Sequence, residues 1–149
     1  MSPPPAPRRL YLAEPHALWL QRPPVVADCS AVAALIFEEP AGDSAAAMLV
    51  GRALHAPTLL PYELASVASK KQRAGAAQDW VDAALLAYTE QRIDLHPVPP
   101  EAATRLAARY ALSAYDAAYL WLAAELKAPL ATFDRKLAEA AQRHLAAPD

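Results

Sequence analysis

The sequence predicts an α/β fold in which a short parallel sheet is flanked by helices. Short apolar segments alternate with longer helical segments, and this order produces a parallel sheet. The chain has 149 residues, about the length of one domain. Hydrophobic residues make up 55% of it and charged residues 20%, so it can form a core rather than remain disordered. We expect four strands, with a fifth only as a shortened edge.

Prolines divide the chain into an arm and a body. Seven of the 15 prolines lie within the first 24 residues. Proline lacks an amide donor and fixes φ, so this segment cannot hold a regular helix or a central strand for long. We therefore predict a proline-rich extended arm over residues 1–24 and one folded domain over residues 25–149.

The first elements of the body are marked by an apolar run and a capping residue. Val25 to Ala27 is apolar and ends in Asp28, which is typical of a buried strand whose end meets solvent. Ser30 can cap a helix over 31–37. A Pro-Ala-Gly break follows and precedes a second helix over 43–54.

The middle of the body continues the alternation. A short extended segment over 55–57 leads to a third helix, which Thr58 can cap and Gly75 can end. A fourth helix follows over 76–89. Residues 93–96 alternate in polarity like a strand, and prolines close this segment.

The last third predicts two helices, a strand and a final helix. The helices cover 101–111 and 113–127, the buried strand covers 129–132, and the last helix covers 134–145. This strand completes the set expected for the sheet.

Charge, cysteine content and hydropathy exclude several classes of protein. The net charge is −2, and residues 25–149 hold 11 basic and 15 acidic side chains, which argues against a generally basic nucleic-acid coat. The single cysteine, Cys29, rules out an internal disulfide and disfavours a cysteine-built zinc site. No apolar run is long enough to span a bilayer, and no convincing signal peptide is present. We expect a soluble cytoplasmic domain.

Two acidic residues occur where predicted strands end. Asp28 ends the first strand and Asp134 follows the last one. The carboxyl ends of strands in an open α/β sheet form the crevices where ligands bind. Each acid can equally be explained by the favourable interaction of its charge with the N-terminus of the following helix. Taken singly, neither residue decides between these readings.

Two further acids lie on the apolar faces of helices. Glu63 is four residues from both Leu59 and Val67, so its carboxylate needs a cation or hydrogen-bond donors. A salt bridge to a nearby basic side chain is the simpler explanation. Asp116 lies three residues after Ser113, which also fits a helix start of the capping-box type.

The combination of the four acids favours a metal site. If the strand ends converge, four carboxylates meet at one edge of the sheet, and their pKa values rise unless a cation neutralises them. Mg²⁺ and Mn²⁺ prefer carboxylates and retained waters. Such a site can activate a water and stabilise charge on a phosphodiester.

Four short motifs carry a family resemblance, and they occur in order over residues 25–145. They are Val-Val-Ala-Asp28-Cys-Ser30, Pro57-Thr-Leu-Leu-Pro-Tyr-Glu63-Leu-Ala, Leu112-Ser-Ala-Tyr-Asp116-Ala-Ala-Tyr-Leu and Leu130-Ala-Thr132-Phe-Asp134-Arg-Lys-Leu137. Together they resemble the PIN-domain ribonucleases, most closely the VapC-type toxins of toxin–antitoxin pairs. The chain departs from that pattern because 24 residues precede its first strand.

The resemblance implies a metal-dependent endoribonuclease that hydrolyses internal RNA phosphodiesters and acts as the toxin of a type II pair. It implies a homodimer and a cognate antitoxin that blocks the acidic groove. Carried over by position, the catalytic residues that hold Mg²⁺ or Mn²⁺ are Asp28, Glu63, Asp116 and Asp134. Ser30 and Thr132 resemble the hydroxyl residues that orient a carboxylate or a metal-bound water.

A net-negative nuclease still needs cations to bind its substrate. We expect Arg135 or Lys136, beside the fourth acid, to lie nearest the scissile phosphate. The basic cluster from Lys70 to Arg73 has a simpler explanation, because cations favour a helix C-terminus. Trp80 and Trp121 occur at helical spacing and fit core or dimer contacts better than base stacking.

Two other function classes stay open. A Mg²⁺-dependent phosphatase or phosphoacceptor domain also places an aspartate after its first strand. A haloacid-type phosphatase needs a second aspartate where Ser30 stands, and three glycines are too few for a phosphate loop. The other class is an interaction domain that keeps the fold without the metal. A phosphatase releases phosphate from small esters, a nuclease cuts internal phosphodiesters, and a binding module does neither.

Overall fold

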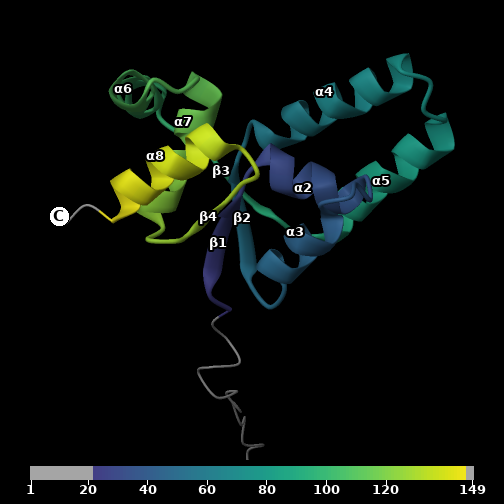
Figure 1. Ribbon diagram of the computed structural model, residues 1–149, viewed down its shortest axis with the longest axis horizontal. Coiled ribbons are helices and arrows are strands. Elements are labelled where there is room, and N and C mark those ends of the chain that lie inside the picture. The colour runs from purple at the N-terminus through teal and green to yellow at the C-terminus, as the bar shows by residue number, and fades with distance from the viewer. Residues whose placement is uncertain (1–21, 147–149) are drawn as a thin grey trace, which may run out of the picture.

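A parallel sheet of four strands forms the centre of the protein, as a computed structural model that describes residues 22–146 shows (Figure 1). The strands lie in the order β3-β2-β1-β4 and every pair is parallel. The elements are β1 (Pro24–Ala27), α2 (Cys29–Ile36), α3 (Gly42–Leu49), β2 (Ala53–Pro57), α4 (Leu60–Arg73), α5 (Gln78–Glu90), β3 (Asp94–His96), α6 (Pro100–Tyr110), α7 (Ala114–Glu125), β4 (Leu130–Ala131) and α8 (Arg135–Leu145). The predicted α/β class with a parallel sheet is confirmed.

The chain reverses its direction of travel across the sheet next to β1. It passes from β1 outward to β2 and β3, and then returns so that β4 pairs with the free side of β1. Val26 therefore pairs with His55 on one side and with Leu130 on the other. This reversal is a topological switch point, and open α/β sheets bind their ligands at such points, outside the carboxyl ends of the strands.

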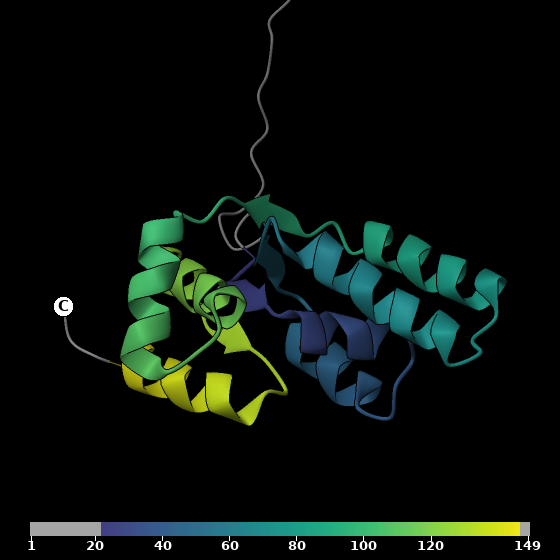
Figure 2. The ribbon, with the colours of Figure 1, turned by 90° about the horizontal axis from the view of Figure 1, so that it is seen from above.

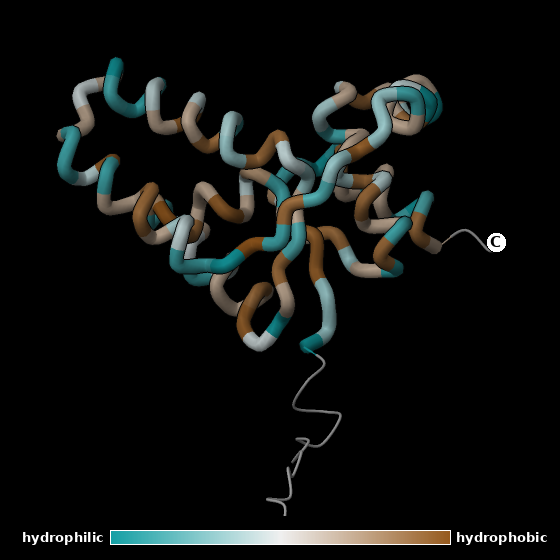
Figure 3. Tube along the Cα trace, turned by 180° about the vertical axis from the view of Figure 1, so that it is seen from behind, coloured by the Kyte–Doolittle hydropathy of each residue, from teal (hydrophilic) through white to brown (hydrophobic). Residues whose placement is uncertain are grey.

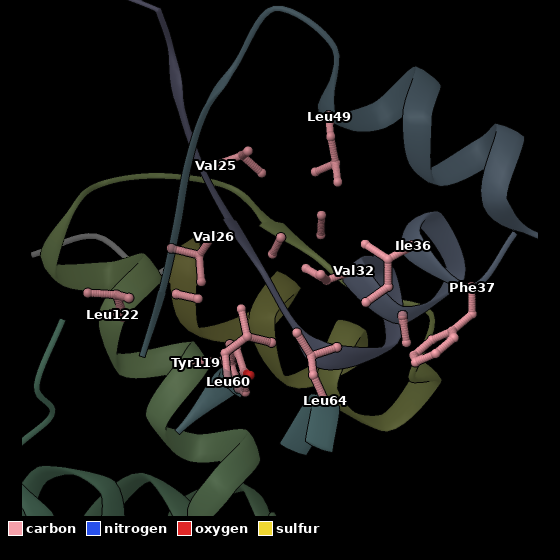
Figure 4. Close-up of a cluster of buried hydrophobic side chains, with 14 of the residues drawn as sticks. Val25, Val26, Val32, Ile36, Phe37, Leu49, Leu60, Leu64, Tyr119 and Leu122 are labelled. Atoms are coloured by element: carbon pink, nitrogen blue, oxygen red, sulfur yellow. The ribbon is translucent and has the colours of Figure 1, made fainter. Parts of the chain in front are cut away.

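The helices form two groups, one on each side of the sheet. Seen from above, α2 to α5 lie together on one side and α6 to α8 on the other (Figure 2). Side chains from β1, α2, α4 and α7 meet in the main core (Figure 4). Hydrophobic residues gather where the strands cross the middle of the molecule, while the far ends of α4 and α5 are hydrophilic (Figure 3). The sheet and its core thus fix where each strand ends.

The predictions that Ser30 caps α2 and that Thr58 caps α4 are wrong. Helix α2 begins at Cys29 and is capped by Asp28, whose carboxylate accepts the N–H of Ala31 at 3.0 Å, so Ser30 lies inside the helix. Helix α4 has no side-chain cap. Its first turn contains a proline, which has no N–H that a cap would need to satisfy.

The boundary between α3 and β2 also differs from the prediction. Helix α3 ends at Leu49 rather than at residue 54, because Gly51 has a φ of +74°, a left-handed conformation that a helix cannot continue through. Strand β2 consequently begins at Ala53. The predicted arm lies outside the described residues except for 22–24, and Pro24 belongs to β1.

Within residues 22–146, no helix is both long enough and apolar enough to cross a membrane.

Candidate active site

Asp28 is fixed at the carboxyl end of β1 by three hydrogen-bond donors. Its Oδ1 accepts the Ala31 N–H at 3.0 Å and the Ser30 hydroxyl at 2.6 Å, and its Oδ2 accepts the Thr132 hydroxyl at 2.6 Å. The residue is only 5% exposed and is the one buried charged residue in the described part of the chain. A carboxylate at such a depth is costly unless donors surround it. The fold therefore holds this carboxylate in one orientation.

The two hydroxyls also tie the loop after β4 to the first turn of α2. The Ser30 hydroxyl oxygen accepts the backbone N–H of Phe133 at 2.9 Å, and the Thr132 hydroxyl oxygen accepts that of Asp134 at 2.9 Å. Both hydroxyls donate to Asp28. The acid after β1 and the acid after β4 are thus joined through one network.

Glu63 receives a hydrogen bond from a buried tyrosine on another helix. The hydroxyl of Tyr119, on α7, donates to Glu63 Oε1 at 2.7 Å. Tyr119 is 1% exposed, while Glu63 is half-buried in the first turn of α4. No lysine or arginine among residues 22–146 pairs with Glu63. The salt-bridge explanation is therefore wrong, and Tyr119 supplies the compensating donor.

The remaining two acids lie at the starts of α7 and α8. The predicted role of Ser113 is confirmed, because its hydroxyl accepts the N–H of Asp116 at 3.1 Å. Asp134 caps α8 by accepting the N–H of Leu137 at 2.9 Å through Oδ1. The capping explanation is thus correct for Asp134, as it is for Asp28. Capping does not remove these carboxylates from the strand edge at which they lie.

The electrostatics show that the four acids lie close enough to affect one another. Burial raises the pKa of Asp28, and the charge of Asp134 raises it further. The hydrogen bonds that Asp28 accepts lower its pKa, but by less than these effects raise it. Burial, then Asp116 and Asp28, raise the pKa of Glu63 despite the bond from its tyrosine. Burial, then Asp134 and Asp28, raise the pKa of Asp116. The fold therefore gathers like charges at the carboxyl edge of the sheet, which is the condition for a cation site.

The cysteine beside this cluster is not a nucleophile. Burial and the charge of Glu63 raise the pKa of the Cys29 thiol to about 12. The reactive form of cysteine is the thiolate. Cysteine chemistry is thus excluded at neutral pH.

The donor set fits a hydrated magnesium ion by its chemistry. All the charged donors are carboxylates, and no lysine or arginine in the described part of the chain forms an ion pair with any of the four. No three histidine, cysteine, aspartate or glutamate residues among 22–146 are arranged as a ready metal cage. Magnesium keeps several waters and uses only one or two carboxylates directly. The edge thus matches a hydrated ion rather than a cage of direct protein ligands.

The two basic residues beside Asp134 differ in their surroundings. Lys136 lies near Asp116, because its positive charge lowers the pKa of the Asp116 carboxyl. Burial and the neighbouring acids raise the same pKa by more. Arg135 forms an ion pair with Glu139 at 3.0 Å on the same helix, and its side chain is 92% exposed. Lys136 is therefore the better placed of the two to approach a bound anion.

The other basic cluster and the tryptophans pack elsewhere. Lys71 forms an ion pair with Glu39 at 3.2 Å and lies 5.0 Å above the ring of Phe37. The ring of Trp80 lies 5.4 Å from the ring of the same phenylalanine. Trp121 packs against the main core and against a second hydrophobic cluster formed by α6, α7 and α8. These contacts support the structural explanation for these residues.

Sequence reasoning missed two features of the site. The sequence around Tyr119 indicates only a core residue, and the hydrogen bond from its hydroxyl to Glu63 shows that it also contacts the site. An exposed aromatic residue also stands immediately before three of the four candidate acids, Glu63, Asp116 and Asp134. These aromatics are Tyr62, Tyr115 and Phe133. The repeated aromatic–acid dipeptide was the available signal.

Comparisons with known proteins agree with the fold. The family model described as PIN domain matches residues 25–143. The crystal structure of PAE2754 from Pyrobaculum aerophilum is similar, with a TM-score of 0.61 and 22% sequence identity over 83% of this chain and 94% of that one. This structural similarity shows that the two proteins share a fold. No curated protein sequence matches the chain.

Proposed function

The chain belongs to the PIN domain family, and on that premise we propose that it is a metal-dependent endoribonuclease. PIN domains are generally nucleases that use divalent metal ions such as Mg²⁺. The observation that carries the proposal is the gathering of four carboxylates, three of them with raised pKa values, at the switch point of the sheet. Carboxylates that gather with raised pKa values are typical of functional sites.

The residues that would hold the ion are Asp28, Glu63, Asp116 and Asp134. When bound, a divalent ion supplies an activated water and stabilises charge on the phosphodiester. Ser30 and Thr132 fix the carboxylate of Asp28 by donating to its two oxygens.

Tyr119 and Lys136 complete the proposed roles. The Tyr119 hydroxyl holds Glu63 and favours its ionised form, which is the form that binds a cation. Lys136 is proposed to face the phosphate, and Arg135 to contact the strand only after leaving its pair with Glu139. Because the ion carries most of the attraction, a net-negative domain can still bind a polyanion.

The finer role follows the motif resemblance. We propose that the enzyme cuts RNA, acts as the toxin of a type II toxin–antitoxin pair, and works as a homodimer restrained by an antitoxin. The order and spacing of the four motifs support this role.

A Mn²⁺ titration by calorimetry tests the site before any substrate is known. We expect saturable binding by the wild type and its loss in Asp28→Asn and in Asp116→Asn, each with unchanged far-UV circular dichroism. Asp79→Asn is the matched control, because Asp79 also lies in the first turn of a helix but is exposed on α5. It should bind as the wild type does.

Cleavage then separates the function classes. The proposed nuclease cuts an RNA strand internally in Mn²⁺ and releases no phosphate from small esters. Release from small esters would indicate a phosphatase. Normal folding with neither metal binding nor cleavage would contradict the proposal and leave an interaction domain.

A further inference from the structure

Exposed aromatic side chains are concentrated beside the acids. Tyr62 is 79% exposed, Tyr115 64% and Phe133 42%. The other exposed aromatic in the described residues, Trp80, packs on Phe37. A large exposed ring leaves much of its apolar surface in water, and three such rings next to candidate site acids indicate a surface that binds a ligand.

Each of these rings is tied by the backbone to the acid that follows it. Tyr62 precedes Glu63 in the first turn of α4, and Tyr115 precedes Asp116 in the first turn of α7. Neighbouring Cα atoms are 3.8 Å apart, and successive helical side chains diverge by about 100°. Each of these two rings therefore starts one residue away from an acid and points in a different direction from that acid.

Phe133 is held by the network that fixes Asp28. Its own N–H donates to the Ser30 hydroxyl at 2.9 Å, and the next N–H, that of Asp134, donates to the Thr132 hydroxyl at 2.9 Å. The backbone is thus anchored on both sides of an exposed ring. A platform held in this way loses little conformational freedom when a flat ligand stacks on it.

We propose that Tyr62, Tyr115 and Phe133 stack on unpaired bases on either side of the phosphate bound at the acidic edge. The proposal rests on the nuclease function and adds the residues that position the strand. A nucleic-acid strand alternates phosphates with flat bases, and an exposed aromatic ring directly precedes three of the four acids proposed to bind beside the phosphate. Stacking is tolerant of sequence because every base has a π-face, so these residues select unpaired strands rather than a particular base.

An abasic strand separates base stacking from phosphate binding. The probe is a labelled uridine oligonucleotide of about six nucleotides, and the reference is the abasic strand with the same phosphates. Binding is followed by fluorescence anisotropy in Ca²⁺, a hard cation that also prefers oxygen ligands, and strand integrity is checked afterwards. Tyr62→Ala, Tyr115→Ala and Phe133→Ala should each weaken binding of the uridine strand about 5- to 150-fold. Binding of the abasic strand should not change.

Conservative variants distinguish a base from a protein partner. Tyr62→Phe keeps the π-face and should bind as the wild type does, whereas Tyr62→Leu keeps apolar area and should lose affinity as the alanine variant does. Leu86→Ala is the control, because Leu86 is 61% exposed on α5, which carries none of the four acids. Retention of affinity by Tyr62→Leu would overturn base stacking in favour of a protein contact.

The outcomes also separate this inference from the proposed function. Equal weakening on both strands, or no weakening on either, overturns the stacking role even if the enzyme cuts RNA. Aromatic-dependent binding of the uridine strand without cleavage supports stacking and contradicts the nuclease. A wild type that binds neither strand overturns both.

Discussion

Removing the Thr132 hydroxyl should destabilise the protein more at alkaline pH than at acidic pH. Thr132→Val is nearly isosteric and deletes the donor to Asp28 Oδ2 at 2.6 Å. Since Asp28 is buried, water cannot replace that donor. The variant therefore leaves one oxygen of a buried carboxylate without a partner. It also removes the acceptor of the Asp134 N–H, a loss that does not depend on the charge of Asp28.

The magnitude depends on whether Asp28 carries a charge. A hydrogen bond to an ionised group contributes about 1.5–3 kcal/mol, and one to a neutral group about 0.5–1.5 kcal/mol. The pH-dependent part is therefore about 1–1.5 kcal/mol, which equals an upward pKa shift of about one unit for Asp28. Burial already raises this pKa above its ordinary value of 3.8, so Asp28 ionises only above that value. The loss is largest above the folded pKa and shrinks as the pH falls through it.

Urea denaturation of wild type and variant at about pH 8 and at about pH 3.5, where the raised pKa keeps Asp28 mostly protonated, measures this difference without metal. Thr104→Val is the matched control, because the Thr104 hydroxyl donates to the neutral carbonyl of Pro100 at 2.8 Å. Its small effect should be the same at both pH values. A Thr132→Val loss that is equal at both pH values would refute the reasoning, since the hydroxyl would then not act on the charge.

Three further outcomes follow from the same contacts. Without metal, the raised carboxyl pKa values mean that the folded state binds more protons than the unfolded chain does. The contribution of these carboxyl groups to the free energy of unfolding therefore falls as the pH rises from about 4 through the raised pKa values. Glu63→Gln should make the melting temperature less dependent on pH over this range. Tyr119→Phe should cost about 1–2 kcal/mol near pH 8 and weaken Mn²⁺ binding in calorimetry, because Glu63 loses its donor; unchanged Mn²⁺ affinity would contradict the positioning role. Gly42→Ala should cost about 1–3 kcal/mol in urea denaturation, since its Cβ would lie 2.8 Å from the carbonyl oxygen of Ala34, whereas the exposed Ser44→Ala should be neutral.

The order of strands and helices could be predicted because each apolar run is bounded by a strong local signal. The caps of α2 and α4 could not, although Ser30 and Thr58 are good capping residues in isolation. Asp28 lies two positions closer to the end of β1 than Ser30 does and caps α2 in its place, and α4 begins without a side-chain cap and has a proline in its first turn. The choice depends on where the backbone leaves the sheet, which is a tertiary property.

The four acids could be identified as candidate site residues because each has an unusual local sequence context. The charge either follows a predicted strand or lies on the apolar face of a predicted helix. Their convergence depends on the return of β4 beside β1, which periodicity does not encode. The partner of Tyr119 is 56 residues away in sequence, so no local pattern marks its hydroxyl as part of the site.

The hydrogen bond between Thr132 and Asp28 joins residues 104 positions apart in sequence, so it can form only late in the synthesis of the chain. A chain emerging from the ribosome can pack β1, β2 and the helices between them early, because these elements are close in sequence. Asp28 acquires its last donor only when β4 pairs with β1. The hydrogen-bond network around Asp28 is therefore completed only after β4 has been synthesised, so a nascent chain that ends before β4 lacks it.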